Sequence, residues 1–309
     1  MRIVCIGQAA FGEKVVQALL ERGEEIVGVY APPDVSGKGD PMSQFARQAG
    51  IPVFQSEKFK DFQVFDRYTE LKPDLNVMAF VTDILPESVL SYPRSGTIQY
   101  HPSLLPRHRG GSAINWAIIN GETKTGITIF WPDKGIDTGP VLLQKEANIL
   151  PDDTVGSLYF NKLFPLGVEA IVESIELIKQ GMAPRIPQDE SQATYEGLCT
   201  EKEAMIDWAK PVNEVYNLIR GTNPQPGATT FLRKQKLKIF DAALITSGQT
   251  GVIDASPGEV AEITVDGFTI AAVKGAIIVK RVQPAGSPKV KASEFVRQVN
   301  LKAGDKLGN

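Results

Sequence analysis

RIVCIGQAAFGEKVVQALLERGEEIVGVY, residues 2–30, is the stretch that decides the fold. It begins with an apolar, β-rich run that ends in Gly7, and it closes with a second such run at residues 25–30. Between them, apolar residues recur at helical spacing, at Val15, Val16, Leu19 and Leu20. The order strand, helix, strand predicts a βαβ unit. Because GQAAFG at residues 7–12 lacks the full GxGxxG pattern, its glycines indicate a tight turn and close helix packing rather than a dinucleotide site.

The same alternation continues through the first 182 residues, which we expect to form one domain. The pattern predicts strands at 75–80, 96–100, 125–130 and 141–145, and helices at 41–49, 86–91, 112–120 and 154–180. Alternating strands and helices favour an α/β fold with a Rossmann-like, doubly wound and mostly parallel sheet.

The composition changes after this region. Residues 183–203 open with a proline-rich polar stretch, which is typical of a linker. Residues 204–309 then become mainly β, with strands expected at 237–244, 258–265, 267–273 and 276–282 and a helix at 291–301. Short strands separated by glycine turns predict a small OB-like β-barrel domain.

The bulk composition is that of an ordinary globular protein. The 309 residues are 42% hydrophobic and 22% charged, with a formal net charge of −3. No secretory signal and no apolar run of membrane-spanning length is evident, so we expect a cytoplasmic protein without a membrane partner. The two cysteines, Cys5 and Cys199, have no zinc-site spacing, and we expect no metal and no disulfide.

Both histidines of the chain lie in one run, QYHPSLLPRHRGG, residues 99–111. His101 follows the predicted strand at 96–100, and the carboxyl ends of such strands are where open α/β sheets bind ligands. Imidazole is suited to moving protons near neutral pH, although a lone histidine also serves as a structural hydrogen-bonding group. Arg107 and Arg109, with the glycines after them, would alternatively suit a phosphate.

A second polar cluster, DKGIDTGP at residues 133–140, lies between two predicted strands. Asp137 in such a loop is a turn former in the simplest interpretation. If neighbouring strands bring this loop beside His101, the carboxylate can hold a protonated imidazole or act as a base.

HPSLLPR at residues 101–107 and GIDTG at residues 135–139 together resemble the folate-dependent formyltransferase family. The similarity is greatest to the amino-terminal hydrolase domains of 10-formyltetrahydrofolate dehydrogenases, and methionyl-tRNA formyltransferases are also similar. Further shared text includes SAINW at 112–116, TIFW at 128–131, LPDDTV at 150–155 and ATYEG at 193–197.

The resemblance implies the formyltransferase fold, with 10-formyltetrahydrofolate as formyl donor and no metal. It implies that His101 is the catalytic histidine and Asp137 the essential carboxylate. Many members have asparagine where this chain has Gln99, so Gln99 either offers its amide to the oxyanion or points into solvent. The remaining residues implied to bind folate are Asp83, Ile84 and Leu85, which would contact it along the backbone, and Ser103, Leu104, Leu105 and Pro106, which would shape the pocket.

The formyl acceptor is less clearly indicated than the donor. Residues 31–40, APPDVSGKGD, hold one lysine and two aspartates, which is poor chemistry for phosphates and disfavours tRNA as a partner. We therefore expect transfer to water or a small acceptor, and no oxidation of the formyl group by these 309 residues alone. Residues 282–286, 292–295 and 304–308 nevertheless resemble tRNA formyltransferases. Methionyl-tRNA formyltransferase, amino-sugar formyltransferase and a non-catalytic folate-binding module remain alternatives.

Overall fold

The computed structural model describes residues 1–34, 39–55, 62–81, 84–246 and 254–308. Contacts divide the chain into two compact units. The first comprises Met1–Gly110, Gly126–Ala147 and Asn161–Tyr195, and the second Gly111–Thr125, Asn148–Phe160 and Glu196–Asn309. Residues 183–195, at the start of the predicted linker, thus pack within the first unit.

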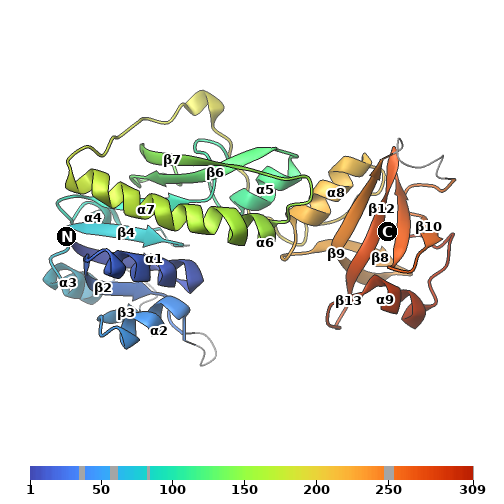
Figure 1. Ribbon diagram of the computed structural model, residues 1–309, viewed down its shortest axis with the longest axis horizontal. Coiled ribbons are helices and arrows are strands. Elements are labelled where there is room, and N and C mark those ends of the chain that lie inside the picture. The colour runs from blue at the N-terminus through green and yellow to red at the C-terminus, as the bar shows by residue number, and fades with distance from the viewer. Residues whose placement is uncertain (35–38, 56–61, 82–83, 247–253, 309) are drawn as a thin grey trace. The chain divides into compact units, whose positions relative to one another are not determined.

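The first unit is built on a seven-stranded sheet with the order β3-β2-β1-β4-β5-β6-β7 (Figure 1). From β3 to β5 every neighbouring pair is parallel, and β5 pairs with β6 in the antiparallel sense. This confirms the predicted Rossmann-like, mostly parallel sheet. Its strands are β1 (Arg2–Gly7), β2 (Glu25–Ala31), β3 (Val53–Gln55), β4 (Leu75–Ala79), β5 (Thr97–His101), β6 (Lys124–Phe130) and β7 (Val141–Asn148).

Helices pack on this sheet because its strands present apolar side chains on both faces of the sheet. Val4 and Ile6 of β1 pack with Tyr68 and Val89, which come from two helices of the described chain. A separate group of rings joins Phe11 to Phe164, with centroids 5.3 Å apart. The helices are α1 (Ala9–Glu21), α2 (Pro41–Gln48), α3 (Phe62–Glu70), α4 (Glu87–Leu90) and α7 (Phe164–Lys179).

Gly7 ends β1 where a side chain has no room. A Cβ at this position would lie 1.9 Å from the carbonyl oxygen of Ala79, at the end of β4. The tight turn predicted from the GQAAFG run therefore has a steric cause, the close approach of two strand ends.

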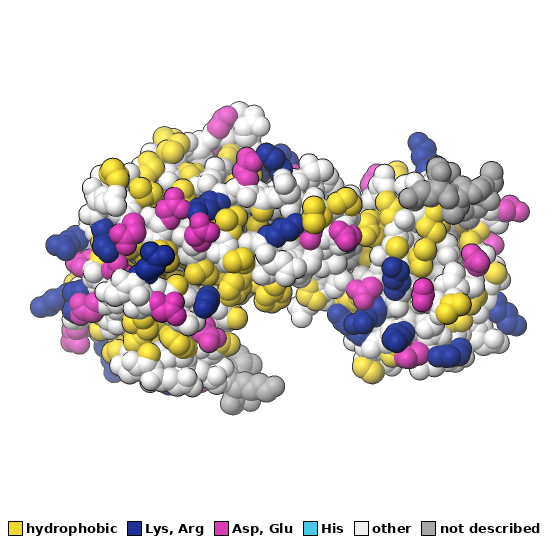
Figure 2. All heavy atoms as spheres, in the orientation of Figure 1, with side chains coloured by type: hydrophobic (Ala, Val, Ile, Leu, Met, Phe, Trp, Pro, Cys, Tyr) yellow, Lys and Arg dark blue, Asp and Glu magenta, His cyan; other side chains and the backbone are white. Residues whose placement is uncertain are grey.

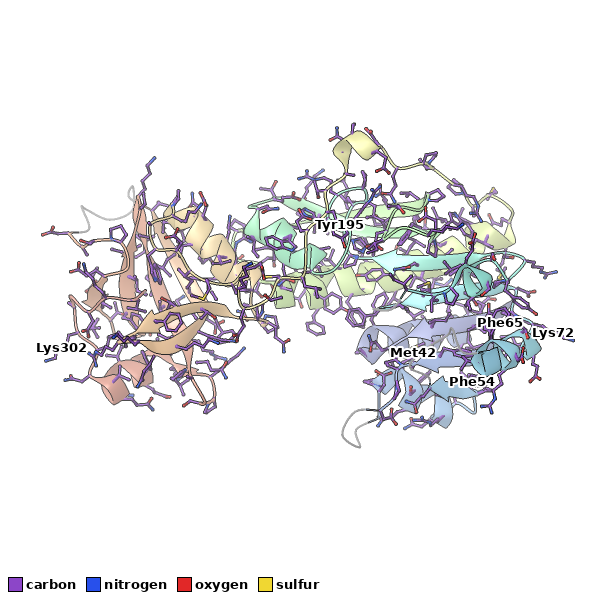
Figure 3. The ribbon with its side chains drawn as sticks, turned by 180° about the vertical axis from the view of Figure 1, so that it is seen from behind. Met42, Phe54, Phe65, Lys72, Tyr195 and Lys302 are labelled. Carbon is purple, nitrogen blue, oxygen red and sulfur yellow. The ribbon has the colours of Figure 1, made fainter. Side chains whose placement is uncertain are left out.

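The sequence patterns did not predict β3 and α3. Phe54 of β3 stacks on Tyr30 of β2, with ring centroids 4.7 Å apart, and Figure 3 labels Phe54 and Phe65 at this end of the unit. A three-residue strand is too short to show the alternation by which strands are predicted.

The helix predicted at 154–180 is confirmed as an uninterrupted helical run over residues 155–179, but its hydrogen-bonding pattern changes, so that it consists of three segments. They are α6 (Val155–Leu158), a π-helix (Tyr159–Leu163) and α7. Pro165 lies in the first turn of α7 and has no N–H for the hydrogen bond that an unbroken α-helical pattern needs. The apolar spacing continues through the π-helical turn, which is why that turn was not predicted.

The second unit contains a six-stranded antiparallel sheet with the order β10-β11-β12-β9-β8, with β13 also paired to β12. Its C-terminal segment connects the two sheet edges, since Gly308 N donates to Phe231 O of β8 and Val260 N of β10 donates to Asp305 O. The strands are β8 (Ala228–Leu232), β9 (Gln235–Thr246), β10 (Val260–Ile263), β11 (Phe268–Ala272), β12 (Gly275–Pro284) and β13 (Val290–Lys291). The helices are α5 (Ala113–Ile119), α8 (Val212–Gly221) and α9 (Ala292–Val299), besides α6. None of the helices in the described ranges has the length and apolar character that crossing a bilayer requires.

Candidate active site

His101 is the last residue of β5, where its backbone pairs with Thr128 of β6. Its side chain is 5% exposed, and no histidine is visible on the face shown in Figure 2. The ring nitrogen Nε2 lies 2.8 Å from the carbonyl oxygen of His108. That contact fixes the ring, so Nδ1 is the nitrogen left to exchange a proton with another group.

Asp137 lies in the loop between β6 and β7, and its carboxylate faces that second nitrogen. Oδ2 is 3.5 Å from Nδ1 of His101 and accepts a hydrogen bond of 2.8 Å from the backbone N–H of Gly110. The side chain of Asp137 is buried, and its backbone is left-handed, with φ of 57°. Nearby, a Cβ on Gly139 would lie 1.8 Å from the carbonyl oxygen of Trp131, so the loop closes tightly only with glycine there.

Burial and charge act on His101 in opposite directions. Burial lowers the pKa of His101 below its ordinary value, and the nearby carboxylate of Asp137 partly opposes this effect. With the pKa lowered, the ring is neutral near pH 7. Nε2 then carries the proton that faces His108 O, and Nδ1 has a free lone pair. A neutral imidazole can accept a proton at Nδ1, and the carboxylate beside it would stabilise the imidazolium that forms.

The turn after His101 is held by buried hydrogen bonds. Ser103 Oγ donates to Arg107 O at 2.6 Å, and Ser103 O accepts from Thr128 Oγ1 at 2.7 Å. Leu105 N donates to the same hydroxyl, and Leu105 O accepts from Gln144. Pro106 O accepts from Thr194 N. These contacts position the turn after the catalytic histidine candidate.

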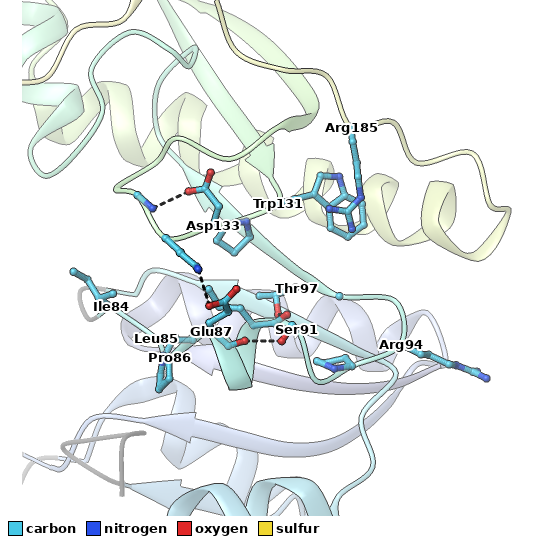
Figure 4. A pocket seen from close by; sticks show the side chains of 16 residues that line it. Ile84, Leu85, Pro86, Glu87, Ser91, Arg94, Thr97, Trp131, Asp133 and Arg185 are labelled. Atoms are coloured by element: carbon cyan, nitrogen blue, oxygen red, sulfur yellow. Dashed lines mark hydrogen bonds and ion pairs between the residues drawn. The ribbon is translucent and has the colours of Figure 1, made fainter. Parts of the chain in front are cut away.

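A cavity of about 880 Å³ lies in the first unit (Figure 4). Some of its lining residues are close to His101 and Asp137 in sequence. Thr97, at the start of β5, and Gly135, two residues before Asp137, both line it. Arg185 lies over the Trp131 ring at 4.0 Å and forms another part of the wall.

The residues predicted to bind folate fall into three groups, one of which lines this cavity. Ile84 and Leu85 line it, with Ile84 73% exposed and Leu85 buried. Asp83 lies outside the described residues. Residues 103–106, including Leu104, are not among the lining residues and belong to the turn described above.

Gln99 lies two residues before His101 on β5, so the two side chains leave the same face of the strand. Its backbone pairs with Phe130 of β6 and Met78 of β4. The side chain is half-buried and makes no hydrogen bond to the part of the chain that the structure describes.

Sequence reasoning missed the contribution of residues 184–194. Pro184 O accepts from Trp131 Nε1, Gln188 donates to the Asp137 loop, and Thr194 accepts from His108 N. Arg109, considered above for a phosphate, is instead engaged by Gln188 and Glu190. The ATYEG run at 193–197 was a signal for this segment, but a polar, proline-rich stretch predicts a linker and not a wall of the site.

No group of three or more His, Cys, Asp and Glu side chains in the described ranges is arranged to hold a metal ion.

Comparison with known proteins identifies the family. Residues 1–175 match the family model described as formyl transferase, and residues 199–300 match the one described as formyl transferase, C-terminal domain. The cytosolic 10-formyltetrahydrofolate dehydrogenase of Homo sapiens is 46% identical over 262 residues, which is 83% of this chain but 29% of the human protein. The chain thus spans less than a third of that relative.

A second relative matches over its whole length. The methionyl-tRNA formyltransferase of Syntrophus aciditrophicus (strain SB) is 37% identical over 312 residues, covering 99% of this chain and 98% of that protein. Among solved structures, HypX from Aquifex aeolicus in complex with tetrahydrofolic acid has a TM-score of 0.69 at 20% identity, over 99% of this chain and 48% of its own, which is a likeness in fold. The family models and the full-length relative together show that this chain belongs to the formyl transferase family.

Proposed function

We propose that this protein binds 10-formyltetrahydrofolate and transfers its formyl group to water or a small acceptor, releasing tetrahydrofolate. The observation that carries the proposal is the buried pair of His101 and Asp137, 3.5 Å apart, with His101 at the carboxyl end of β5. The names of the human and HypX matches, which concern a formyl-tetrahydrofolate and tetrahydrofolic acid, support the choice of donor.

The cavity fits a folate in size and chemistry. Its volume of about 880 Å³ lies within the range of small-molecule sites. Leu85, Leu90 and Trp131 offer apolar surface for a flat pterin ring, and the lining segment 132–135 adds polar residues. Because the lining includes Gly135, two residues before Asp137, we propose that a pterin held there directs N10 and its formyl group toward His101 and Asp137.

The reaction needs three events, and the pair supplies a group for each. An acceptor oxygen or nitrogen attacks the formyl carbon, negative charge develops on the formyl oxygen, and the bond from carbon to N10 breaks. With water as acceptor, the neutral Nδ1 of His101 takes a proton as the new bond forms. The carboxylate of Asp137 stabilises the imidazolium, which then returns the proton to N10. The products are tetrahydrofolate and formic acid, which releases its proton to water to give formate, so atoms and charges balance.

Oxyanion stabilisation belongs in this proposal to His101 and Gln99. Protonated His101 offers an N–H, and Gln99 projects from the same strand face with an amide that is not otherwise engaged by the described residues. We propose that Ile84 and Leu85 contact the folate directly, and that residues 103–106 act by holding the turn after His101.

The test is to incubate the protein with 10-formyltetrahydrofolate alone and measure tetrahydrofolate and formate by chromatography. Equal amounts of the two products support the hydrolase. His101→Ala and Asp137→Asn serve as matched controls, and either variant with near-parental turnover would contradict the assigned roles.

A second candidate, methionyl-tRNA formyltransferase, is favoured by one observation. The relative with that name matches this chain end to end, whereas the dehydrogenase is more than three times longer than the matched region. Against it, basic and acidic side chains are interspersed on the face shown in Figure 2, and no purely basic surface is visible there. Residues 35–38 of the loop used above to disfavour tRNA lie outside the described residues.

Adding charged initiator tRNA to the same assay separates the candidates. Formyl-methionine on the tRNA, with a steep loss of activity as salt rises, identifies the tRNA enzyme. Formate without tRNA identifies the hydrolase. Neither product, with folate binding retained, indicates an amino-sugar acceptor or a binding module.

A further inference from the structure

Residues 184–194, which include a 3-10 helical turn at Glu190–Gln192, run along the loops that carry the candidate catalytic pair, within the first unit. Ile186 and Val141 exchange two backbone hydrogen bonds, of 2.8 and 2.9 Å. At its far end Thr194 accepts from Arg109 N and donates to Pro106 O through its backbone. The segment is therefore fixed to the loop after β5 and to the start of β7.

Gln188 lies in the middle of this segment and uses all of its polar side-chain capacity on the site. Its Nε2 donates to Asp137 O at 2.9 Å and to Gly139 O at 2.7 Å. Its Oε1 accepts from Arg109 at 3.1 Å from Nε and 2.8 Å from Nη2. A neutral amide is the side-chain group that donates two hydrogen bonds and accepts two at once.

Arg109 connects this amide to the other side of the carboxylate. Its guanidinium is 7% exposed and makes a two-pronged contact with Glu190, at 2.9 and 2.7 Å. The next residue, Gly110, donates its backbone N–H to Asp137 Oδ2. Asp137 is thus held at its carbonyl by Gln188 and at its carboxylate by Gly110, and Arg109 joins the two supports.

The Asp137 backbone is left-handed, with φ of 57°, a sparsely populated region that aspartate tolerates better than most residues and that these contacts stabilise. If this backbone relaxes, the carboxylate rotates away from His101. A displacement of about 1 Å at a reacting group can cost about a hundredfold in rate.

We propose that Gln188 is a positioning residue, which fixes the Asp137–Gly139 backbone so that the Asp137 carboxylate faces His101. The expected effect on kcat rests on the proposed function, whereas the positioning of Asp137 by Gln188 does not depend on it. With Gln188 in this role, residues 184–194 are part of the active site.

The experiment compares Gln188→Leu and Gln188→Glu with Gln192→Leu. Leucine removes every hydrogen bond of the amide. Glutamate keeps an acceptor for Arg109 but turns an oxygen toward two carbonyl oxygens and adds a negative charge, so it removes the donor role while keeping the size of the side chain. Gln192 is an exposed glutamine of the same segment, with a 3.5 Å contact to Ser191 Oγ, and serves as the matched control.

With 10-formyltetrahydrofolate we expect kcat to fall at least tenfold in both Gln188 variants, with KM within about twofold of the parent, and Gln192→Leu to match the parent. A merely structural role would instead lower the amount of folded protein and leave kcat per folded molecule unchanged. Should Gln188→Leu fail to fold by circular dichroism, Gln188→Glu, which differs from the parent by one group, carries the test.

A second readout does not need activity. The chain has two histidines, so the ring-nitrogen NMR signals of His101 can be assigned with one His108→Gln variant. We expect the His101 signals to move in both Gln188 variants and to stay in place in Gln192→Leu. If the parent does not turn over the folate, the proposed function fails while this readout still tests Gln188. Unchanged His101 signals and unchanged kcat in both Gln188 variants would overturn the proposal.

Discussion

Replacing Thr128 with valine is expected to destabilise the first unit by about 3 kcal/mol. Thr128 lies on β6 opposite His101, and its side chain is fully buried. Its hydroxyl donates to Ser103 O at 2.7 Å and accepts from Leu105 N at 3.1 Å and Gln144 Nε2 at 2.9 Å. Valine keeps the shape of the side chain and removes all three bonds.

The magnitude follows from what is left behind. Each buried hydrogen bond contributes about 1 kcal/mol net, which gives about 3 kcal/mol for the three. The cost does not fall much below this, because water does not reach the Leu105 N–H to replace the lost acceptor. Gln144 loses less, since it retains its 2.8 Å bond to Leu105 O.

Urea unfolding measures the global effect, and hydrogen exchange of residues 102–107 measures the local one. We expect an earlier unfolding midpoint and faster exchange of the Leu105 amide. Thr125→Val is the matched control, because Thr125 is buried on the same strand and its hydroxyl makes no hydrogen bond to the described residues. The reasoning is refuted if the two variants differ by less than about 0.5 kcal/mol, which is the usual scale of a neutral substitution.

Five further outcomes are expected. His101→Ala and Asp137→Asn should each lower turnover of 10-formyltetrahydrofolate by roughly a hundredfold, or about 3 kcal/mol of barrier, while circular dichroism shows a folded protein. Because burial lowers the pKa of His101, its neutral form persists below the ordinary value of about 6.5, so the acidic limb of kcat/KM should lie below that pH. For the same reason, neutral His101 contributes fully to the free energy of unfolding above about pH 6.5, and this contribution is lost as the pH falls toward the lowered pKa. Urea unfolding midpoints measured from acidic to neutral pH would show this loss. A midpoint that rises on acidification would contradict it. Gly139→Ala, whose Cβ would lie 1.8 Å from a carbonyl oxygen, should lower both the melting temperature and turnover, and parental values for both would argue against the tight loop. Burial raises the pKa of the Cys5 thiol to about 12 and that of Cys199 to about 11, so a thiol-labelling reagent at neutral pH should modify neither quickly until the protein is unfolded.

Much of the fold was accessible from local patterns. The βαβ unit of residues 2–30 was predicted because strand and helix periodicities alternate there, and the structure has β1, α1 and β2 at these places. The π-helical turn within the helix predicted at 154–180 was not predicted, because apolar spacing does not reveal the effect of Pro165 on the hydrogen bonds of the preceding turn. The connection between β8 and β10 through residues 305–308 was also hidden, since it joins segments that are distant in sequence.

The candidate site, like the fold, was predicted from the sequence only in part. The sequence by itself determined which residue types are present, the two motifs that contain His101 and Asp137, and through them the family. Only the tertiary structure decided that Nδ1 of His101 faces Asp137 at 3.5 Å. It also decided that Gln188, 51 residues further along the chain, donates a hydrogen bond to the backbone carbonyl of Asp137. The physical reason is that motif residues are specified by local chemistry, whereas hydrogen bonds between distant segments depend on backbone positions that exist only once the sheet has formed.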